Sequence, residues 1–600
     1  MLPLLPLLLC LQSPADPGTC YRFRVFEPDA TRRQALEQRF GDDCGAHQAD
    51  GSIEVIVAPE ELGEFRALGL ASVTLVERGR PFREIREELR QRGPLAPDPN
   101  YYTVAELDTL LTNLEAQYPA LCRKINVTQL VGGPLTHDGQ SITALKISDN
   151  PAVMEDEPAV LIVAQHHARE LNSTHMVIGA AQRLLQGYAS DAGIRQIVDS
   201  HELWLIPCVN PDGTTWCWNV DNLWRKNRRN NGGGVFGVDN NRNYSFYWNS
   251  ATCGGSTATS NETYRGPSAL SEPENQVLDR LGTLLRPEQY LDFHSSGQQV
   301  LNTYNSCARE PANATTLLNF FRDDLRNQMT YGFRDPSASG EAPEHHWVQS
   351  GTLSYLTEIS TAFQPVWSST VAEEARVWPG IRRALDWQPA LRGHVRAVCG
   401  NTPLAAEILV PQMGFVDGER NFAEATFGRY KAWLPPGTFT VTFRATGYQD
   451  FTTSVTVGAF NVTQTLDVFL VPTGAPATLQ RTGAGQPGTP VQLTYQSPGD
   501  AGRDYWVAMA LGSVPGIALG SRTVPINGDA LFLASLNLFP ILVNNLGVLP
   551  AGDTVVATFN VPPVPALVGL TFWFDGITLD PSCQAGVRAF SPSLSVTIQP

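Results

Sequence analysis

The spacing of hydrophobic residues predicts short strands and helices at the start of the chain. Apolar and polar residues alternate as in half-buried strands at 21–26, 52–57 and 72–76, and apolar residues recur at helical spacing at 31–40 and 60–68. A charged and then proline-rich stretch at 86–99 is typical of a linker. We therefore expect a small α+β unit at 20–90.

In the region 100–388, segments with the apolar spacing of a helix alternate with apolar runs typical of buried strands. Helical spacing occurs at 104–118 and 172–186, and strand-like runs occur at 142–147, 159–164 and 203–209. Helices that alternate with buried strands are typical of an α/β sheet, in which ligands bind at the strand ends. The pattern predicts this fold class for the region.

From residue 391 onward the pattern changes to short alternating strands. Runs such as 438–444 and 453–457 follow turns that contain glycine, and they predict a small β-sandwich at 391–472. Residues 473–600 contain no Lys and no Glu, and their short apolar strands predict a second β-sandwich.

Length and composition narrow the class of protein. A chain of 600 residues, 42% hydrophobic and 17% charged, is typical of a folded protein with several domains. The net charge of -16 disfavours nucleic acid and anionic membranes as partners and mainly favours solubility. Residues 1–18 resemble a secretory signal, and no later stretch is apolar and long enough to be a transmembrane segment. We expect a secreted or extracytoplasmic protein.

Cysteine content agrees with export. The chain has 10 cysteines, which fit a few disulfides in an oxidising compartment. Plausible pairs are Cys20 with Cys44, and Cys253 with either Cys208 or Cys217. The sequence does not choose between the last two.

A candidate metal site follows the apolar run at 159–164. His167 and Glu170 lie on the turn between that strand and the next helix. A neutral imidazole and a carboxylate that converge there can bind Zn²⁺, and His294, at the end of another apolar strand, can supply a third ligand. Three protein ligands leave one position open for water, as in catalytic zinc sites. Taken alone, a His-x-x-Glu spacing is equally compatible with a structural role.

Further polar groups occur in a set order along the same region. They are Arg169, Asn210-Pro211-Asp212-Gly213, Trp224-Arg225-Lys226, Asp239, Asn241-Arg242, Glu262-Thr263-Tyr264 and Glu358. Together with His167, Glu170 and His294, this set resembles the zinc metallocarboxypeptidase family of the carboxypeptidase A/B type. The resemblance covers about residues 100–385. It implies a mixed-sheet catalytic domain.

The resemblance implies a role for each residue near the metal. His167, Glu170 and His294 would bind one Zn²⁺, and Asp239 would accept a hydrogen bond from His167 to fix its tautomer. Glu358 would be the general base that takes a proton from zinc-bound water.

The resemblance also implies how a substrate would be bound. Arg225 would stabilise the oxyanion together with zinc, and the loss of one such donor costs roughly 3–4 kcal/mol. Asn241 and Arg242 would bind the C-terminal carboxylate of a peptide, because a guanidinium fork matches a carboxylate. Arg169 would line the next subsite. Such a clamp restricts hydrolysis to the last peptide bond.

Each of these residues also has a structural interpretation. Arg225 could belong to a solvated basic face, Asp239 and Asn241 to a turn after three glycines, and Glu358 to a buried ion pair. For most of these residues taken singly the structural interpretation is favoured. Their joint occurrence in order favours the site.

Two positions depart from the family's pattern. The family usually has a mobile Tyr shortly before the catalytic Glu, where this chain has Pro336, and the nearest tyrosine is Tyr331. Ser296 stands where a Tyr is frequent, which implies a roomier subsite. We expect altered recognition of the substrate's end and retained activity.

The sequence says little about which C-terminal residue of a substrate would be preferred. Family members that prefer Lys or Arg carry an Asp in the loop that corresponds to Glu344-His345-His346-Trp347, so a basic preference has no support. His345 or His346 could favour an acidic end residue. Neither of them, nor His166, is expected to bind the metal, because the ligand set is already complete.

The flanking units resemble other parts of the family. Residues 20–80 are similar to the pro-domain that shields the active site of some members, joined by a basic, cleavable linker. Residues 391–472 are similar to the transthyretin-like β-sandwich of regulatory carboxypeptidases. A merely structural N-terminal unit is the alternative.

The sequence thus predicts an α/β, mixed-sheet, zinc-carboxypeptidase-like domain, preceded by a small α+β domain and followed by two β-sandwiches. The expected function is zinc-dependent hydrolysis of the C-terminal peptide bond of peptides or proteins. The alternatives are a zinc amidase acting on N-acyl amino acids or cell-wall peptides, and a catalytically inactive binding protein.

Overall fold

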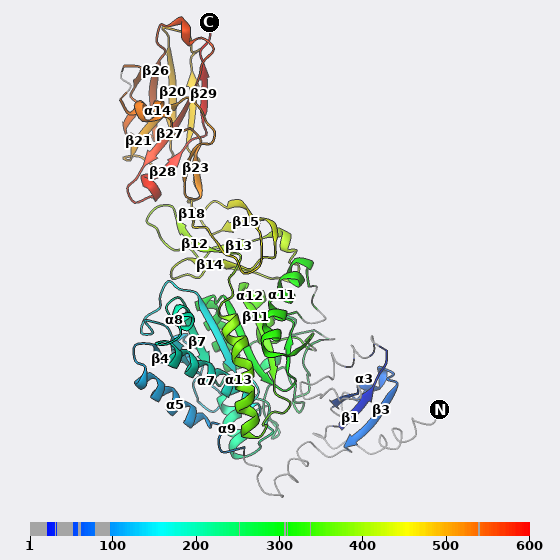
Figure 1. The fold of residues 1–600 in the computed structure, drawn as a ribbon. Coiled ribbons are helices and arrows are strands. Elements are labelled where there is room, and N and C mark those ends of the chain that lie inside the picture. Colours follow the sequence, from blue (N-terminus) through cyan, green and yellow to red (C-terminus); the bar gives the residue numbers. More distant parts are fainter. Residues whose placement is uncertain are drawn as a thin grey trace.

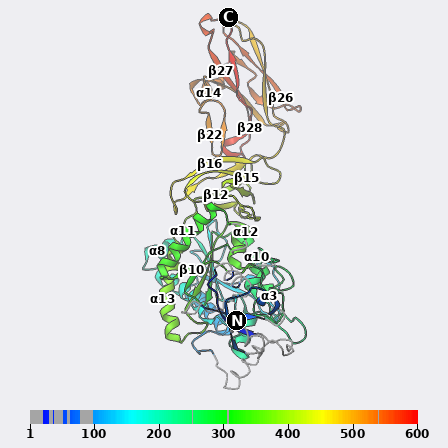
Figure 2. The same ribbon diagram turned by 90° about the vertical axis from the view of Figure 1, so that its right-hand side faces the viewer.

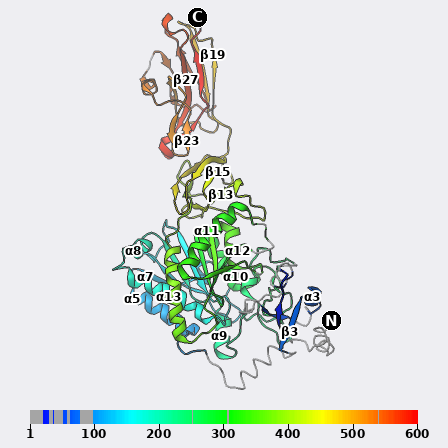
Figure 3. The ribbon, with the colours of Figure 1, turned by 45° about the vertical axis from the view of Figure 1, so that its right-hand side comes forward.

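The computed structural model describes residues 21–29, 32, 36, 52–57, 62–77, 97–250, 253–304, 308, 310–336, 338–537 and 540–600. Figure 1 shows an α/β unit at the bottom, a small β unit above it and a second β unit at the top. The turned views keep this stacking (Figures 2 and 3), and Figure 3 shows the N-terminal strands beside the α/β unit. The division into five segments that is expected from the sequence stays a prediction.

The N-terminal unit is a three-stranded antiparallel sheet in the order β2-β1-β3. Its elements are β1 (Tyr21–Phe26), β2 (Ile53–Val57), α3 (Leu62–Ala67) and β3 (Ser72–Glu77). Phe23 of the sheet stacks on Phe65 of the helix at 4.8 Å between ring centroids. The expected strands and second helix are therefore confirmed. The expected signal segment and most of the linker lie outside the described residues.

An eight-stranded sheet forms the centre of the α/β unit, in the order β10-β9-β11-β8-β6-β7-β5-β4. Its strands are β4 (Cys122–Asn126), β5 (Thr143–Ile147), β6 (Ala159–Ala164), β7 (Glu202–Ile206), β8 (Gln289–Ser295), β9 (Gln299–Leu301), β10 (Gly332–Arg334) and β11 (Leu353–Ile359). The central strands β11, β8, β6 and β7 pair in parallel, whereas β4, β5 and β7 pair antiparallel. This mixed sheet confirms the predicted fold class.

Helices cover both faces of this sheet. They are α5 (Val104–Gln117), α6 (Val127–Leu130), α7 (Leu171–Gly187), α8 (Ala192–Val198), α9 (Pro211–Asn219), α10 (Pro273–Leu285), α11 (Ala312–Met329), α12 (Ala342–Ser350) and α13 (Trp367–Ala384). Val160 and Ile162 of β6 pack with α7, α11 and α13, whereas Leu161 and Val163 pack with α10. An apolar run without alternation is what a strand buried on both faces requires.

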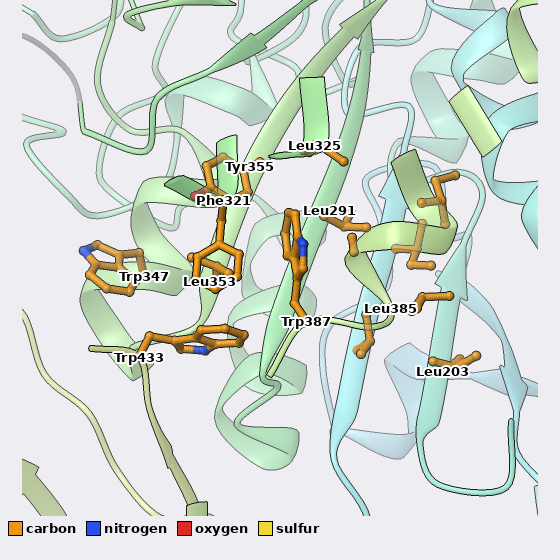
Figure 4. Close-up of a cluster of buried hydrophobic side chains, with 14 of the residues drawn as sticks. Leu203, Leu291, Phe321, Leu325, Trp347, Leu353, Tyr355, Leu385, Trp387 and Trp433 are labelled. Carbon is orange, nitrogen blue, oxygen red and sulfur yellow. The ribbon is translucent and has the colours of Figure 1, made fainter. Parts of the chain in front are cut away.

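The unit above shares its hydrophobic core with the α/β unit. Its strands are β12 (Leu391–Ala397), β13 (Glu407–Leu409), β14 (Arg429–Ala432), β15 (Gly437–Arg444), β16 (Phe451–Val457), β17 (Gln464–Thr465) and β18 (Val468–Leu470). Trp433 packs edge-on against Phe321 of α11 at 5.1 Å, and its indole donates to Glu288 O at 3.1 Å. Figure 4 shows both rings in one cluster with Trp387 and Leu353. Buried Lys431 donates to Ser350 O at 2.7 Å.

The C-terminal unit has a separate core. Its sheets have the orders β19-β20-β26-β24 and β25-β21-β27-β28, with β29 also paired to β27. The elements are β19 (Thr478–Thr482), β20 (Pro490–Gln496), β21 (Asp504–Ala510), β22 (Ile517–Leu519), β23 (Arg522–Val524), α14 (Ala530–Ala534), β24 (Leu542–Val543), β25 (Leu546–Val548), β26 (Thr554–Asn560), β27 (Thr571–Leu579), β28 (Val587–Phe590) and β29 (Leu594–Thr597). Phe559 and Phe574 pack at its centre.

A disulfide joins the two β units. Cys399, just after β12, bonds Cys583, and the two residues also form an isolated β-bridge. Cys208 and Cys217 are free thiols, whereas Cys253 is disulfide-bonded, so the predicted pairing of Cys253 with either of them is wrong. Both thiols are buried in the α/β unit, where packing holds them as small apolar groups. Cys20 and Cys44 lie outside the described residues.

Across the part of the chain that is described, no helix combines the length and the apolar character that crossing a membrane requires.

Asp575 makes the stability of the C-terminal unit sensitive to pH. This fully buried carboxylate on β27 accepts hydrogen bonds from Ser591 N at 2.9 Å and Ser591 Oγ at 2.7 Å. Burial raises the pKa of Asp575 from 3.8 to about 8, although the Ser591 hydrogen bonds oppose the shift. The folded state therefore binds more protons than the unfolded state between these values.

We expect the unfolding midpoint of the C-terminal unit to fall as pH rises from about 4 to about 8. Asp575→Asn, which stays neutral and can still accept from Ser591, should flatten this dependence and raise the midpoint above about pH 8. The measurement is thermal unfolding of the full chain between about pH 4 and about pH 8. Asp504→Asn, at an exposed position of β21, is the control. A pH dependence that Asp575→Asn leaves unchanged would contradict the assignment.

Candidate metal centre

The predicted site residues gather where parallel strands end. His167 and Glu170 follow β6. His294 is the penultimate residue of β8, and Glu358 is the penultimate residue of β11. Since β6, β8 and β11 are parallel neighbours, their carboxyl ends meet at one edge of the sheet. His294 and Glu358 are paired in register, so their side chains project to the same face.

The turn after β6 brings two ligand candidates together. Gln165 leaves the strand in a left-handed conformation, with φ 64°, and its side-chain oxygen accepts a hydrogen bond from Thr174 at 3.0 Å. His167 Nδ1 then lies 2.7 Å from Glu170 Oε1. The hydrogen bond from Thr174 of α7 therefore ties the bend at Gln165 to the helix that follows it.

His294 completes the cluster. Its Nδ1 lies 3.1 Å from Glu170 Oε2 and 3.1 Å from His167 Nδ1. All three side chains are fully buried, and their candidate ligand atoms lie within 4.8 Å of one another. Two imidazole nitrogens that face each other beside a carboxylate form a donor set that suits Zn²⁺. The residues present therefore fit the metal that the sequence predicts.

Asp239 joins this cluster to Arg225. One carboxylate oxygen lies 3.2 Å from His167 Nε2, and the other accepts from the Arg225 guanidinium at 2.8 Å. Burial alone would raise the pKa of Asp239, but the charges of Arg225 and His167 hold it well below its usual range. The carboxylate is therefore ionised, and it can accept a hydrogen bond from His167 while it fixes the Arg225 side chain.

Asn241 and Arg242 lie on the short helical turn Asn240–Arg242. Asn241 Oδ1 accepts from Ala342 N at 2.9 Å, while its Nδ2 is buried and has no hydrogen-bond partner among the described residues. Arg242 donates to Asn241 O at 2.8 Å and to Glu341 at 3.2 Å. A buried amide donor beside a fixed guanidinium suits a bound anion.

Glu358 and Arg169 are buried at the sides of the cluster. A guanidinium nitrogen of Arg334, at the end of β10, lies 3.5 Å from Glu358 Oε1. Arg169 is 3.4 Å from Glu262 and lies over the ring of Phe363 at 4.4 Å. Every residue predicted for the site thus lies on this edge of the sheet or on the loops that cover it.

The Asn210–Gly213 motif contacts the backbone of the two segments that carry His167 and Arg225. Asn210 accepts from Gly213 N at 3.0 Å to begin α9, and it donates to His166 O at 3.1 Å. A Cβ on Gly213 would lie 2.4 Å from Lys226 O, so glycine permits close approach of the turn that carries Arg225. Ala168 N donates to Arg225 O at 2.9 Å and ties that turn to the metal cluster.

Sequence reasoning assigned no role to Asp292 and excluded His166. Both are fully buried beside His294, and the three could also hold a cation. The signal was a charged residue inside the apolar run Leu291–His294, two positions before the ligand candidate. Asp149, Glu155 and Glu157 form another acidic group, which is more exposed.

The positions expected to tune recognition are occupied by packed side chains. Tyr331 donates to buried Glu373, so it does not replace the missing mobile Tyr. His345 lies 2.8 Å from Asp279, and the ring of His346 packs on Tyr290 at 4.2 Å. Both histidines are buried in contacts of the fold, which leaves no support for the acidic preference considered for them.

Residues 107–354 match the zinc carboxypeptidase family. Zinc carboxypeptidase A 1 of Drosophila melanogaster is 28% identical over 278 residues, which cover 45% of this chain and 63% of that protein. A zinc carboxypeptidase of Saccharothrix mutabilis subsp. capreolus is 37% identical over 150 residues, or 25% of this chain and 33% of that protein. The crystal structure of the carboxypeptidase A from Helicoverpa armigera has 20% identity and a TM-score of 0.47, covering 61% of this chain and 96% of that chain.

The chain spans 63% and 33% of the lengths of these two curated relatives, less than two thirds in each case. The family resemblance predicted from the ordered motifs is confirmed for the matched region. The resemblances suggested for the flanking units stay predictions.

Gly213→Ala tests whether the Asn210–Gly213 motif has this supporting role. The added methyl group would collide with the backbone at Lys226 O, and such overpacking costs about 1–3 kcal/mol of unfolding free energy. We expect a lower thermal midpoint and weaker zinc retention. Gly458→Ala is the matched control, because nothing lies within 4 Å of its Cβ. Equal midpoints for the two variants would contradict the close approach.

Proposed function

Since residues 107–354 match the zinc carboxypeptidase family, we propose that this protein hydrolyses the C-terminal peptide bond of peptides or proteins with the help of one zinc ion. The observation that carries the proposal is the meeting of His167, Glu170 and His294 next to Glu358, at the ends of three parallel strands. A binding protein without catalysis has no need of this combination.

His167, Glu170 and His294 would hold the zinc ion. When bound, zinc lowers the pKa of water towards about 7 and polarises a carbonyl oxygen. The contact between Asp239 and His167 supports the assignment, because it turns Nε2 of the ring away from the cluster and leaves Nδ1 facing it.

Glu358 would accept the proton of the attacking water and pass it to the leaving amine. The in-register pairing with His294 supports this role, because it sets the carboxylate beside the metal cluster without making it a ligand. Arg225 would stabilise the negative charge that develops on the carbonyl oxygen, and its ion pair with Asp239 holds it ready.

Asn241 and Arg242 would bind the terminal carboxylate of the substrate. The buried Asn241 Nδ2 without a partner among the described residues is the supporting observation, because a bound carboxylate would satisfy it. Arg169, held by Phe363 and Glu262, would line the adjacent subsite. This arrangement distinguishes a carboxypeptidase from an enzyme that cuts within a chain.

Secretion and shielding of the site by the N-terminal unit are further parts of the proposal. The Cys399–Cys583 disulfide supports export, since disulfides persist mainly in oxidising compartments. The N-terminal unit lies beside the α/β unit in Figures 1 and 3, which is compatible with shielding.

Glu358→Gln should reduce kcat about 100- to 10,000-fold, because the amide cannot accept the water proton. Zinc content should stay equal to that of the unchanged protein, since Glu358 is not a ligand. Peptide hydrolysis and bound zinc are measured on the same samples, with Glu115→Gln on α5 as control. A chelator should remove activity and added zinc should restore it. Retained turnover in Glu358→Gln would exclude this residue as the base.

Peptides with a free C-terminus should be cleaved at least about 100-fold more efficiently, in kcat/KM, than the same peptides with an amidated C-terminus. The reason is that amidation removes the negative charge that Arg242 would attract and the oxygen that would accept from the buried Asn241 Nδ2. Equal rates would contradict the clamp. No cleavage of either peptide, with zinc bound, would favour an inactive binding protein.

A further inference from the structure

We propose that Asp292 is a positioning residue for the metal centre, which holds the His294 ring so that Nδ1 faces the zinc position. His166 holds Asp292 in turn. The inference deepens the proposed function, because it assigns the support of the third ligand within the same site.

The His294 ring directs one nitrogen into the metal cluster and the other towards Asp292. Its Nδ1 lies 3.1 Å from Glu170 Oε2, inside the metal cluster, while its Nε2 lies 3.4 Å from Asp292 Oδ1. A histidine that binds a metal through one nitrogen carries its proton on the other, and a carboxylate there fixes the tautomer and the ring. Asp292 is the carboxylate on that side of the ring.

The second step is that Asp292 is itself fixed. Its Oδ1 lies 3.1 Å from His166 Nδ1, and His166 Nε2 lies 3.1 Å from the Tyr244 hydroxyl. One assignment satisfies both contacts: His166 donates from Nδ1 to Asp292 and accepts from Tyr244 at Nε2. All four residues of this chain are fully buried, so water does not compete for the bonds.

The third step is the repeated geometry at the other histidine. His167 also directs Nδ1 into the cluster, and its Nε2 lies 3.2 Å from Asp239. His294 on β8 and His167 on the turn after β6 thus share one arrangement, each with a buried carboxylate beside its Nε2. The rings of His166 and His294 stack at 5.5 Å with an interplanar angle of 12°, which further restricts rotation of His294.

The contacts from Asp292 through His166 to Tyr244 also connect the metal centre to the segment that carries Asn241 and Arg242. Tyr244 lies two residues after Arg242, and its backbone N–H donates to Gly340 O at 3.0 Å. Asp292 thereby links the strand that carries His294, the turn after β6 and the segment that carries Asn241 and Arg242. A fixed carboxylate at this junction aligns the third ligand with the substrate-binding residues.

The test is zinc affinity, measured by chelator competition on the full chain without substrate. Asp292→Asn should bind zinc about 10- to 100-fold more weakly, similar to Asp239→Asn. The cobalt(II) absorption spectrum of the variant should also change, since the coordination geometry loosens. Asp292→Glu should recover part of the affinity, and Asp279→Asn, which loses a contact to His345 instead, should keep all of it.

Unchanged affinity and spectrum in Asp292→Asn would overturn the inference. Two bound zinc ions per chain, reduced to one by Asp292→Asn, would also overturn it and make His166, Asp292 and His294 a second metal site. If Asp292→Asn does not fold, His166→Gln serves in its place, with a smaller loss expected and unchanged affinity again decisive. Because no substrate is used, weaker zinc binding without hydrolysis by the unchanged protein would support the inference while the proposed function fails.

Discussion

Parallel pairing of β6, β8 and β11 is the constraint on which the site depends. The register between β8 and β11 aligns His294 with Glu358, and β6 delivers His167 and Glu170 to the same edge. No helix or loop contact could replace this alignment, because strand spacing fixes the separation of the side chains. The helices on both faces bury the apolar side chains of these strands, and the candidate ligands lie where the strands end.

Two buried carboxylates beside the candidate metal centre are each shared by two partners. Asp239 is shared by His167 and Arg225, and Asp292 is shared by His166 and His294. An isolated buried carboxylate costs several kcal/mol, and cationic or donor partners offset part of that cost. The protein therefore carries a dense group of ionisable side chains inside its core, and each one orients a neighbour that faces the candidate metal position.

Much of the fold and of the candidate site could be predicted from the sequence. The runs that became β6, β7 and α7 were located because a strand buried on both faces is apolar without interruption, and because α7 has a regular apolar stripe. The ligand candidates were found because several motifs occur in order. Asp292 and His166 were missed, since their partners are 126 residues apart in the chain and only the sheet brings them together. The pairing of Cys253 with Cys208 or Cys217 was wrong because spacing along the sequence does not determine which cysteines meet in the fold.

The two β units are attached to the rest of the molecule in different ways. Trp433 is part of the core of the α/β unit, whereas residues 473–600 have their own core. They meet the neighbouring β unit at the Cys399–Cys583 disulfide and at hydrogen bonds such as the one from Gln584 N to Val398 O at 2.8 Å. Cooperativity follows shared buried area. We therefore expect the α/β unit and the β unit next to it to unfold together, and the terminal unit to unfold as a separate body.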